Sequence, residues 1–325
     1  MNDFTILVLP GAYASSLSVT LDILDAAARL APRARTPRPT WRVLSPDGGD
    51  VALSAHLRLA TARLPARSRE DGSTWIVPGL GLDNPAVIDE RLGCDDACRA
   101  IAAVRRHAAR GGAVAASCSA VFLLQAAGLL SQRRATTSWW LARELQRREP
   151  DCRVDADRMV CADGPITTGG AAMAQSDLML HLLRSRFGVD LADAVSKVLL
   201  LDGRQAQAPF AVPSMMANGS ELVRRLTRRI EAALPRPPSV VELAGELAMS
   251  PRTLARHVRA ATGRGPLALV QSVRLNRARQ LIESSRLSIA QVAESVGYED
   301  ATALRRLMRK CAGAAPSQFR AAWPT

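Results

Sequence analysis

The sequence lacks any long hydrophobic run, has only four histidines, and contains only two lysines among its 43 basic residues. No stretch approaches the roughly 18–20 uncharged apolar residues that a membrane-spanning helix needs, so no span is expected. The first residues, MNDFTILVLPG, have no basic segment before the apolar one, and we interpret them as a strand and not as a signal peptide. The six cysteines have neither disulfide-framework nor zinc-ligand spacing. We therefore expect no metal, no cofactor and a reducing, cytoplasmic location.

Positive charge is concentrated in the last third of the chain. The net charge is +13; residues 214–325 carry 18 basic and 8 acidic side chains, whereas residues 1–213 carry 25 and 22. A clustered positive field favours polyanions such as nucleic acid because binding releases their counterions. The alternative is an arginine-rich composition on an ordinary solvated surface, which charge alone does not exclude.

The pattern of apolar runs divides the chain into an α/β part and an all-α part. The expected strands are Thr5–Leu9, Trp41–Leu44, Trp75–Val77, Ala113–Ala116 and Met159–Cys161. The expected helices are Leu17–Leu30, Cys94–Arg110, Ala120–Ala127, Trp139–Arg148 and Ala172–Phe187. Alternation of the two predicts a doubly wound, mostly parallel, flavodoxin-like sheet in residues 1–203. A linker is expected at 204–219, and about seven helices are expected in residues 220–325.

A two-helix unit occurs twice in the C-terminal part. Residues 239–266 recur at 288–316: Leu243 returns as Val292, and Arg256 returns as Arg306. The pattern predicts helix-turn-helix units at about 239–263 and 288–313. Two equivalent arginine-bearing helices are suited to bind a long, regular, anionic partner, and duplex DNA is the obvious candidate. A helical bundle with charged outer faces is the alternative, but it does not account for the duplicated arginine-bearing helix.

The second helix of each unit is expected to lie in the major groove. Ser250 is a natural N-cap before Pro251, and Glu299 or Asp300 caps the corresponding helix of the second unit. Arginine can pair bidentately with guanine, and threonine can contact a base or a phosphate. The predicted DNA-binding residues are Arg252, Thr253, Arg256, Arg259, Thr302, Arg305, Arg306 and Arg309.

Residues 220–325 resemble the DNA-binding domain of AraC/XylS transcriptional regulators. The most specific segments are LAGELAMSPRTLAR and SIAQVAESVGYEDATALRRLMRK. The resemblance implies two helix-turn-helix units on a rigid linking helix, with Arg252, Arg256, Thr302, Arg305 and Arg306 facing bases in adjacent major grooves.

In the N-terminal part, GGAVAASCSAVFLL predicts a strand, a sharp turn at Cys118 and a helix. One interpretation is a reactive thiolate, because a helix N-terminus tends to lower a thiol pKa. The other is a small residue that fills a tight turn over a pocket. A catalytic thiol needs a base, and only His56 or His181 could be brought close by folding.

This part resembles the ThiJ/PfpI superfamily, which is related to class I glutamine amidotransferase-like folds. The resemblance rests on VLPGAYASSLSVTLDILDAA, WIVPGL, VAASCSAVFLLQAAGLLSQRRATTSWW and TTGGAAMAQSDLMLHLL. Together with the C-terminal part it indicates the GlxA-type subgroup of AraC regulators, in which this domain is a sensor and not an enzyme. Asp22 stands where enzymes have a glutamate, and Ser138 where relatives have histidine. Expected ligand-binding residues are Gly11, Asp22, Gly79, Cys118, Trp139 and Gly169.

We therefore expect a sequence-specific transcriptional regulator and no enzyme activity. Its expected partners are double-stranded DNA, a small nitrogenous effector such as an amine or amino acid, a second copy of the chain, and RNA polymerase if it activates. A cysteine-dependent hydrolase or glyoxalase with a DNA-tethering domain is one alternative. An architectural nucleic-acid-binding protein without an effector is another.

Overall fold

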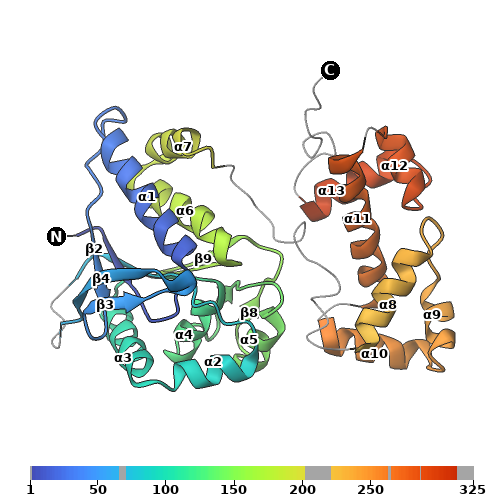
Figure 1. Ribbon diagram of the computed structural model, residues 1–325, viewed down its shortest axis with the longest axis horizontal. Coiled ribbons are helices and arrows are strands. Elements are labelled where there is room, and N and C mark those ends of the chain that lie inside the picture. Colours follow the sequence, from blue (N-terminus) through green and yellow to red (C-terminus); the bar gives the residue numbers. More distant parts are fainter. Residues whose placement is uncertain (1, 66–70, 202–220, 263–264, 286, 313–325) are drawn as a thin grey trace. The chain divides into compact units, whose positions relative to one another are not determined.

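The computed structural model describes residues 2–65, 71–201, 221–262, 265–285 and 287–312, without the side chains of residues 283, 284 and 309–312. The chain forms two compact units, one within residues 1–207 and one within 208–325. Figure 1 shows the α/β unit and the all-helical unit. The linker expected at 204–219 lies outside the described residues.

An eight-stranded sheet forms the centre of the first unit, in the order β3-β4-β2-β1-β5-β6-β10-β9. The strands are β1 (Phe4–Leu7), β2 (Trp41–Ser45), β3 (Gly49–Ala52), β4 (Arg58–Arg63), β5 (Thr74–Val77), β6 (Val114–Ser117), β9 (Val160–Asp163) and β10 (Ile166–Gly169). Pairing is parallel except for the outermost β3–β4 and β9–β10 pairs. The predicted doubly wound, mostly parallel fold is confirmed. Two short strands, β7 (Arg134–Ala135) and β8 (Arg153–Val154), pair separately.

Helices cover the sheet in two groups. The helices are α1 (Ala14–Leu30), α2 (Pro85–Leu92), α3 (Asp95–Ala109), α4 (Val121–Ala126), α5 (Ala142–Arg148), α6 (Gln175–Phe187) and α7 (Val189–Val198). Helices α1, α6 and α7 pack against one another, and α2, α3, α4 and α5 form the other group (Figure 1). The central strand β1 is fully buried because both of its faces are covered.

Several elements differ from the sequence-based expectation. Strands β3, β4 and β10 were not predicted: β3 and β4 lie at the sheet edge with mostly exposed side chains, and β10 has the polar sequence ITTG. Helices α2 and α7 were also not predicted. The helix expected over Trp139–Arg148 begins at Ala142, after a turn that contains both tryptophans.

The second unit contains six described helices: α8 (Glu221–Ala232), α9 (Val240–Glu246), α10 (Pro251–Thr262), α11 (Pro266–Ser284), α12 (Ile289–Ser295) and α13 (Ala301–Ala312). Residues 313–325, where a seventh would fall, lie outside the described ranges. The predicted inward positions are confirmed, since Leu254, Val258, Leu304 and Met308 are all buried. Within this unit α11 lies between the α8–α10 group and the α12–α13 group (Figure 1).

Candidate functional site

Helix α10 exposes the arginines that the sequence analysis selected. The Ser250 hydroxyl accepts a hydrogen bond from the Thr253 backbone N–H at 3.1 Å and so caps the helix. Its oxygen is also 2.9 Å from the Thr253 hydroxyl, which is therefore engaged in the cap. Arg252, Arg256 and Arg259 are exposed.

Helix α13 repeats this arrangement. A carboxylate oxygen of Asp300 accepts the Ala303 backbone N–H at 2.7 Å, which identifies Asp300 as the capping residue. Thr302, Arg305 and Arg306 are exposed. The side chain of Arg309 lies outside the described residues.

The exposed arginines of both helices are available to a partner. Arg252, Arg256, Arg305 and Arg306 form no ion pair with any other described residue. Because an unpaired guanidinium presents its full hydrogen-bonding fork, these side chains suit phosphate and base contacts. The assignment of these arginines to particular bases stays a prediction.

The first helix of each unit begins with the same cap. Ser239 accepts the Glu242 backbone N–H at 3.2 Å, while the Glu242 carboxylate accepts the Ser239 N–H at 2.7 Å. Ser288 and Gln291 form the same reciprocal pair at 3.2 and 2.8 Å. The repeat is therefore structural as well as sequential.

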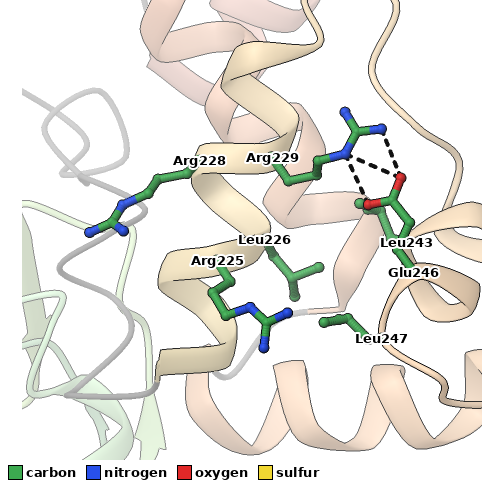
Figure 2. A pocket seen from close by; sticks show the side chains of 7 residues that line it. All are labelled: Arg225, Leu226, Arg228, Arg229, Leu243, Glu246 and Leu247. Atoms are coloured by element: carbon green, nitrogen blue, oxygen red, sulfur yellow. Dashed lines mark hydrogen bonds and ion pairs between the residues drawn. The ribbon is translucent and has the colours of Figure 1, made fainter.

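A hollow of about 250 Å³ lies between α8 and α9. Its lining residues are Arg225, Leu226, Arg228, Arg229, Leu243, Glu246 and Leu247. Figure 2 shows Arg229 paired with Glu246 and Arg228 pointing away from the leucines. Leu226 and Leu243 are only 3% and 2% exposed, so the floor offers little apolar surface to a ligand. The hollow is not a candidate effector site.

In the first unit Cys118 stands on a strained turn at the end of β6. Its φ of 55° lies in the left-handed region, which a non-glycine residue rarely adopts. The turn is held by the Cys118 N–H, which donates to the Gly170 carbonyl at 2.6 Å, and by the Thr137 hydroxyl, which donates to the Cys118 carbonyl at 2.7 Å. The predicted elbow geometry is present.

The thiol itself is buried and not activated. Cys118 is 1% exposed, and burial raises its pKa despite hydrogen bonds that involve Ser138, Ser119 and the Ala172 backbone. The Sγ atom is 3.1 Å from the Ser138 hydroxyl. Desolvation of the thiolate outweighs these hydrogen bonds, which favours the interpretation of Cys118 as a small residue in a tight turn over that of a reactive thiolate. The groups that hydrogen-bond to Cys118 are Ser138, Ser119 and the Ala172 backbone, and neither His56 nor His181 is among them.

Tyr13 lies beside the elbow, and the sequence did not predict this position. A Cβ placed on Gly79 would lie 2.9 Å from the Cys118 Cβ and 3.5 Å from the Tyr13 ring. Burial raises the Tyr13 pKa, and the charges of Cys118 and Asp83 raise it further. Tyr13 therefore lies close to Cys118 and also close to Asp83. A bulky residue right after the Gly11 turn was the available signal.

Asp22, the expected acidic neighbour of Cys118, is not among the groups that most affect the Cys118 pKa. It is exposed on α1, whereas Ser16 and Thr20 on the same helix are buried. Residues two apart on a helix do not face the same way, and Thr20 already accepts from Gln175 at 2.8 Å. The Asp83 carboxylate, also exposed, acts on Tyr13 and raises the pKa of that side chain.

The remaining expected ligand residues are distributed around the turn. Gly11 has a φ of +82°, which supports its turn, and Gly169 packs against Ser117, next to Cys118. Trp139 is half-buried, follows Ser138 and contacts Trp140 edge-on at 5.2 Å between ring centroids. Across the described ranges no group of three His, Cys, Asp or Glu side chains is placed to hold a metal ion. Every helix in the same ranges falls short of what a membrane crossing demands.

Two protein families match segments of the chain, one within each compact unit. Residues 243–322 match a helix-turn-helix domain family, and residues 89–185 match the DJ-1/PfpI family. The chain is 29% identical over 291 residues to the HTH-type transcriptional regulator GlxA of Rhizobium meliloti, with 85% of each chain covered. It is 28% identical over 328 residues to the HTH-type transcriptional regulator CdhR of Pseudomonas aeruginosa, covering 99% of this chain and 92% of that one.

A solved structure supports the fold. A THiJ/PfpI family protein from Pseudomonas syringae matches with a TM-score of 0.50 at 18% identity, covering 83% of this chain and 91% of that one. The matched relatives are named as regulators of transcription and not as enzymes, in agreement with the unactivated thiol.

Proposed function

We propose that this chain, which belongs to the HTH-type transcriptional regulators that join an AraC-type helix-turn-helix domain to a DJ-1/PfpI domain, reads DNA with α10 and α13 and binds an effector beside Cys118. The observation that carries the first half is the duplicated, capped helix with exposed and unpaired arginines.

The two helices read two segments of one duplex. Each recognition helix enters the major groove through its N-terminal turn, and successive segments on one face of DNA lie about 34–36 Å apart. Arg252 and Arg256 contact the first segment, and Thr302, Arg305 and Arg306 the second. Arg259, Arg309 and Thr253 support these contacts.

Alanine substitution tests the residue assignment. We expect Arg256→Ala and Arg306→Ala each to cost about 1–3 kcal/mol of specific binding free energy, concentrated at particular base pairs. The assay is fluorescence anisotropy with a duplex that the wild-type chain selects from a random library, beside a scrambled duplex. Arg224→Ala is the control, since it removes the same charge from α8. Equal losses in all three variants would leave only general electrostatics.

We propose that the effector is a cationic amine or an amino-acid-like molecule. Tyr13 and the half-buried Trp139 offer aromatic faces near the thiol, and Asp83 offers a negative charge. A cation over an aromatic face with a carboxylate nearby gains both cation–π and Coulomb attraction. The position agrees with the rule that open α/β sheets bind ligands at the carboxyl ends of their strands.

Thermal shifts across a panel of amines and amino acids test the effector class. We expect at least one compound to raise the unfolding temperature, and Tyr13→Ala or Asp83→Asn to abolish that rise. Asp22→Asn is the matched control, because it removes the same charge from an exposed position on α1 and should leave the rise intact. A rise that survives Asp83→Asn but not Asp22→Asn would reverse our choice of counter-charge.

We further propose that the chain acts as a homodimer and, as an activator, contacts RNA polymerase. A two-fold dimer would double the number of base contacts on a palindromic site. Sedimentation equilibrium measures the mass, and transcription in vitro with added protein measures the output. A monomer at micromolar concentration that still binds its site fully would remove the dimer from the proposal.

A further inference from the structure

The two helix-turn-helix units have separate hydrophobic cores that meet at one residue of α11. The first core takes its α11 contribution from Leu269, Val270 and Val273, and the second takes its own from residues beginning at Leu275. Arg274 lies between the two. The two cores share only α11, so their packing alone does not fix how the second helix-turn-helix unit is rotated about this helix relative to the first.

Arg274 ties α11 to the turn between α12 and α13. Its Nε donates to the Val296 carbonyl at 2.7 Å, and its Nη2 donates to the Gly297 carbonyl. The guanidinium carbon lies 3.7 Å from the centre of the Tyr298 ring. A planar guanidinium can make the forked pair of bonds and stack at once, whereas an ammonium cannot.

The connection between α8 and α9 reaches the same turn. A Cβ on Gly297 would overlap the Pro235 carbonyl oxygen, so the two backbones touch there. Gly297 also has a φ of +81°, which other residues rarely adopt. Pro235, Arg274, Gly297 and Tyr298 therefore form one contact, here called the junction, in which the α8–α9 connection, α11 and the α12–α13 turn meet.

We infer that the junction fixes the rotation and separation of α10 relative to α13, and so sets the one spacing at which the chain reads its two DNA segments. This inference rests on the proposed DNA-reading function. Arg274 is a positioning residue: it acts through the Gly297 turn and need not touch DNA. Without it, only α11 and the Pro235–Gly297 backbone contact connect the two helix-turn-helix units, and the second of them can follow a displaced DNA segment.

The test measures tolerance of spacing. A duplex selected by the full wild-type chain from a random library is compared with duplexes carrying one or two extra base pairs between the two recognised segments. Each inserted pair turns the second segment by about 34–36° around the duplex. We expect wild-type affinity to fall about tenfold or more on one insertion, since contacts in one segment are lost.

For Arg274→Met we expect weaker binding at the native spacing and an insertion penalty of about threefold or less. Arg277→Met is the matched control: it removes the same charge from an exposed position on α11 and should keep the wild-type penalty. An Arg274→Met chain that is folded by circular dichroism and keeps the wild-type penalty would overturn the inference. If that variant does not fold, Arg274→Lys decides, because an unchanged penalty there has the same meaning.

The experiment distinguishes failure of the DNA-reading function from failure of the junction inference. If the wild-type chain selects no preferred sequence, the DNA-reading function fails and the junction has nothing to position. If it selects a two-segment site and every variant keeps the spacing penalty, the DNA-reading function stands and the junction inference alone is wrong.

Discussion

Replacing Gly79 with alanine tests how closely β5 approaches the elbow. The new Cβ would lie 2.9 Å from the Cys118 Cβ, well inside the optimum of about 3.5–4.0 Å between carbon atoms. Overpacking of this kind costs about 1–3 kcal/mol, partly offset by about 0.4–1 kcal/mol from the lower entropy of the unfolded alanine chain. We expect Gly79→Ala to lower the free energy of unfolding by about 1–2 kcal/mol.

A double-mutant cycle isolates this contact. Cys118→Gly removes the opposing Cβ and relieves a φ of 55°, so Gly79→Ala should cost almost nothing in that background. Cys118→Ala keeps the Cβ, so the full cost of Gly79→Ala should remain. The coupling energy with glycine should therefore be about 1–2 kcal/mol, and that with alanine close to zero.

Urea unfolding followed by tryptophan fluorescence measures these energies. Four of the five tryptophans lie within residues 1–207, so the signal reports mainly on the first unit. Equal rescue by Cys118→Ala and Cys118→Gly would refute the reasoning, because it would assign the clash to the sulfur, which lies 3.7 Å from the same position.

Three further outcomes are expected. Because burial raises its pKa, Cys118 should react with iodoacetamide more slowly at pH 7 than the exposed cysteines, as peptide mass spectrometry of a time course would record. Ser239→Ala and Ser288→Ala should each destabilise the second unit by about 1 kcal/mol in thermal unfolding followed by circular dichroism, and unequal losses would contradict equivalent caps. Partial burial raises the pKa of Asp96, but the paired hydrogen bonds from Arg91 outweigh this effect and hold that pKa below its ordinary value. The ionised carboxylate therefore adds stability above about pH 4, and this stability is lost as the pH falls through the folded pKa. Asp96→Asn should cost stability at pH 7 and little in acid.

The sequence by itself determined the features that depend on local spacing. Burial of Leu254 and Val258 follows from their separation of four residues, and the caps follow from serine or aspartate three residues before a free backbone N–H. The mostly parallel sheet follows from alternating apolar strands and helices. Edge strands such as β4 were not predicted, because side chains that are mostly exposed give the sequence no continuous run of apolar residues there.

Only the tertiary structure decided the state of the elbow and the geometry of the junction. Whether Cys118 is a thiolate depends on desolvation by residues from several elements, and burial outweighs the helix N-terminus that the sequence pointed to. The effect of the Asp83 carboxylate on Tyr13 joins segments 70 residues apart, and local spacing does not encode it. Arg274 meets Gly297 across 23 residues, a contact between distant segments that no local spacing encodes.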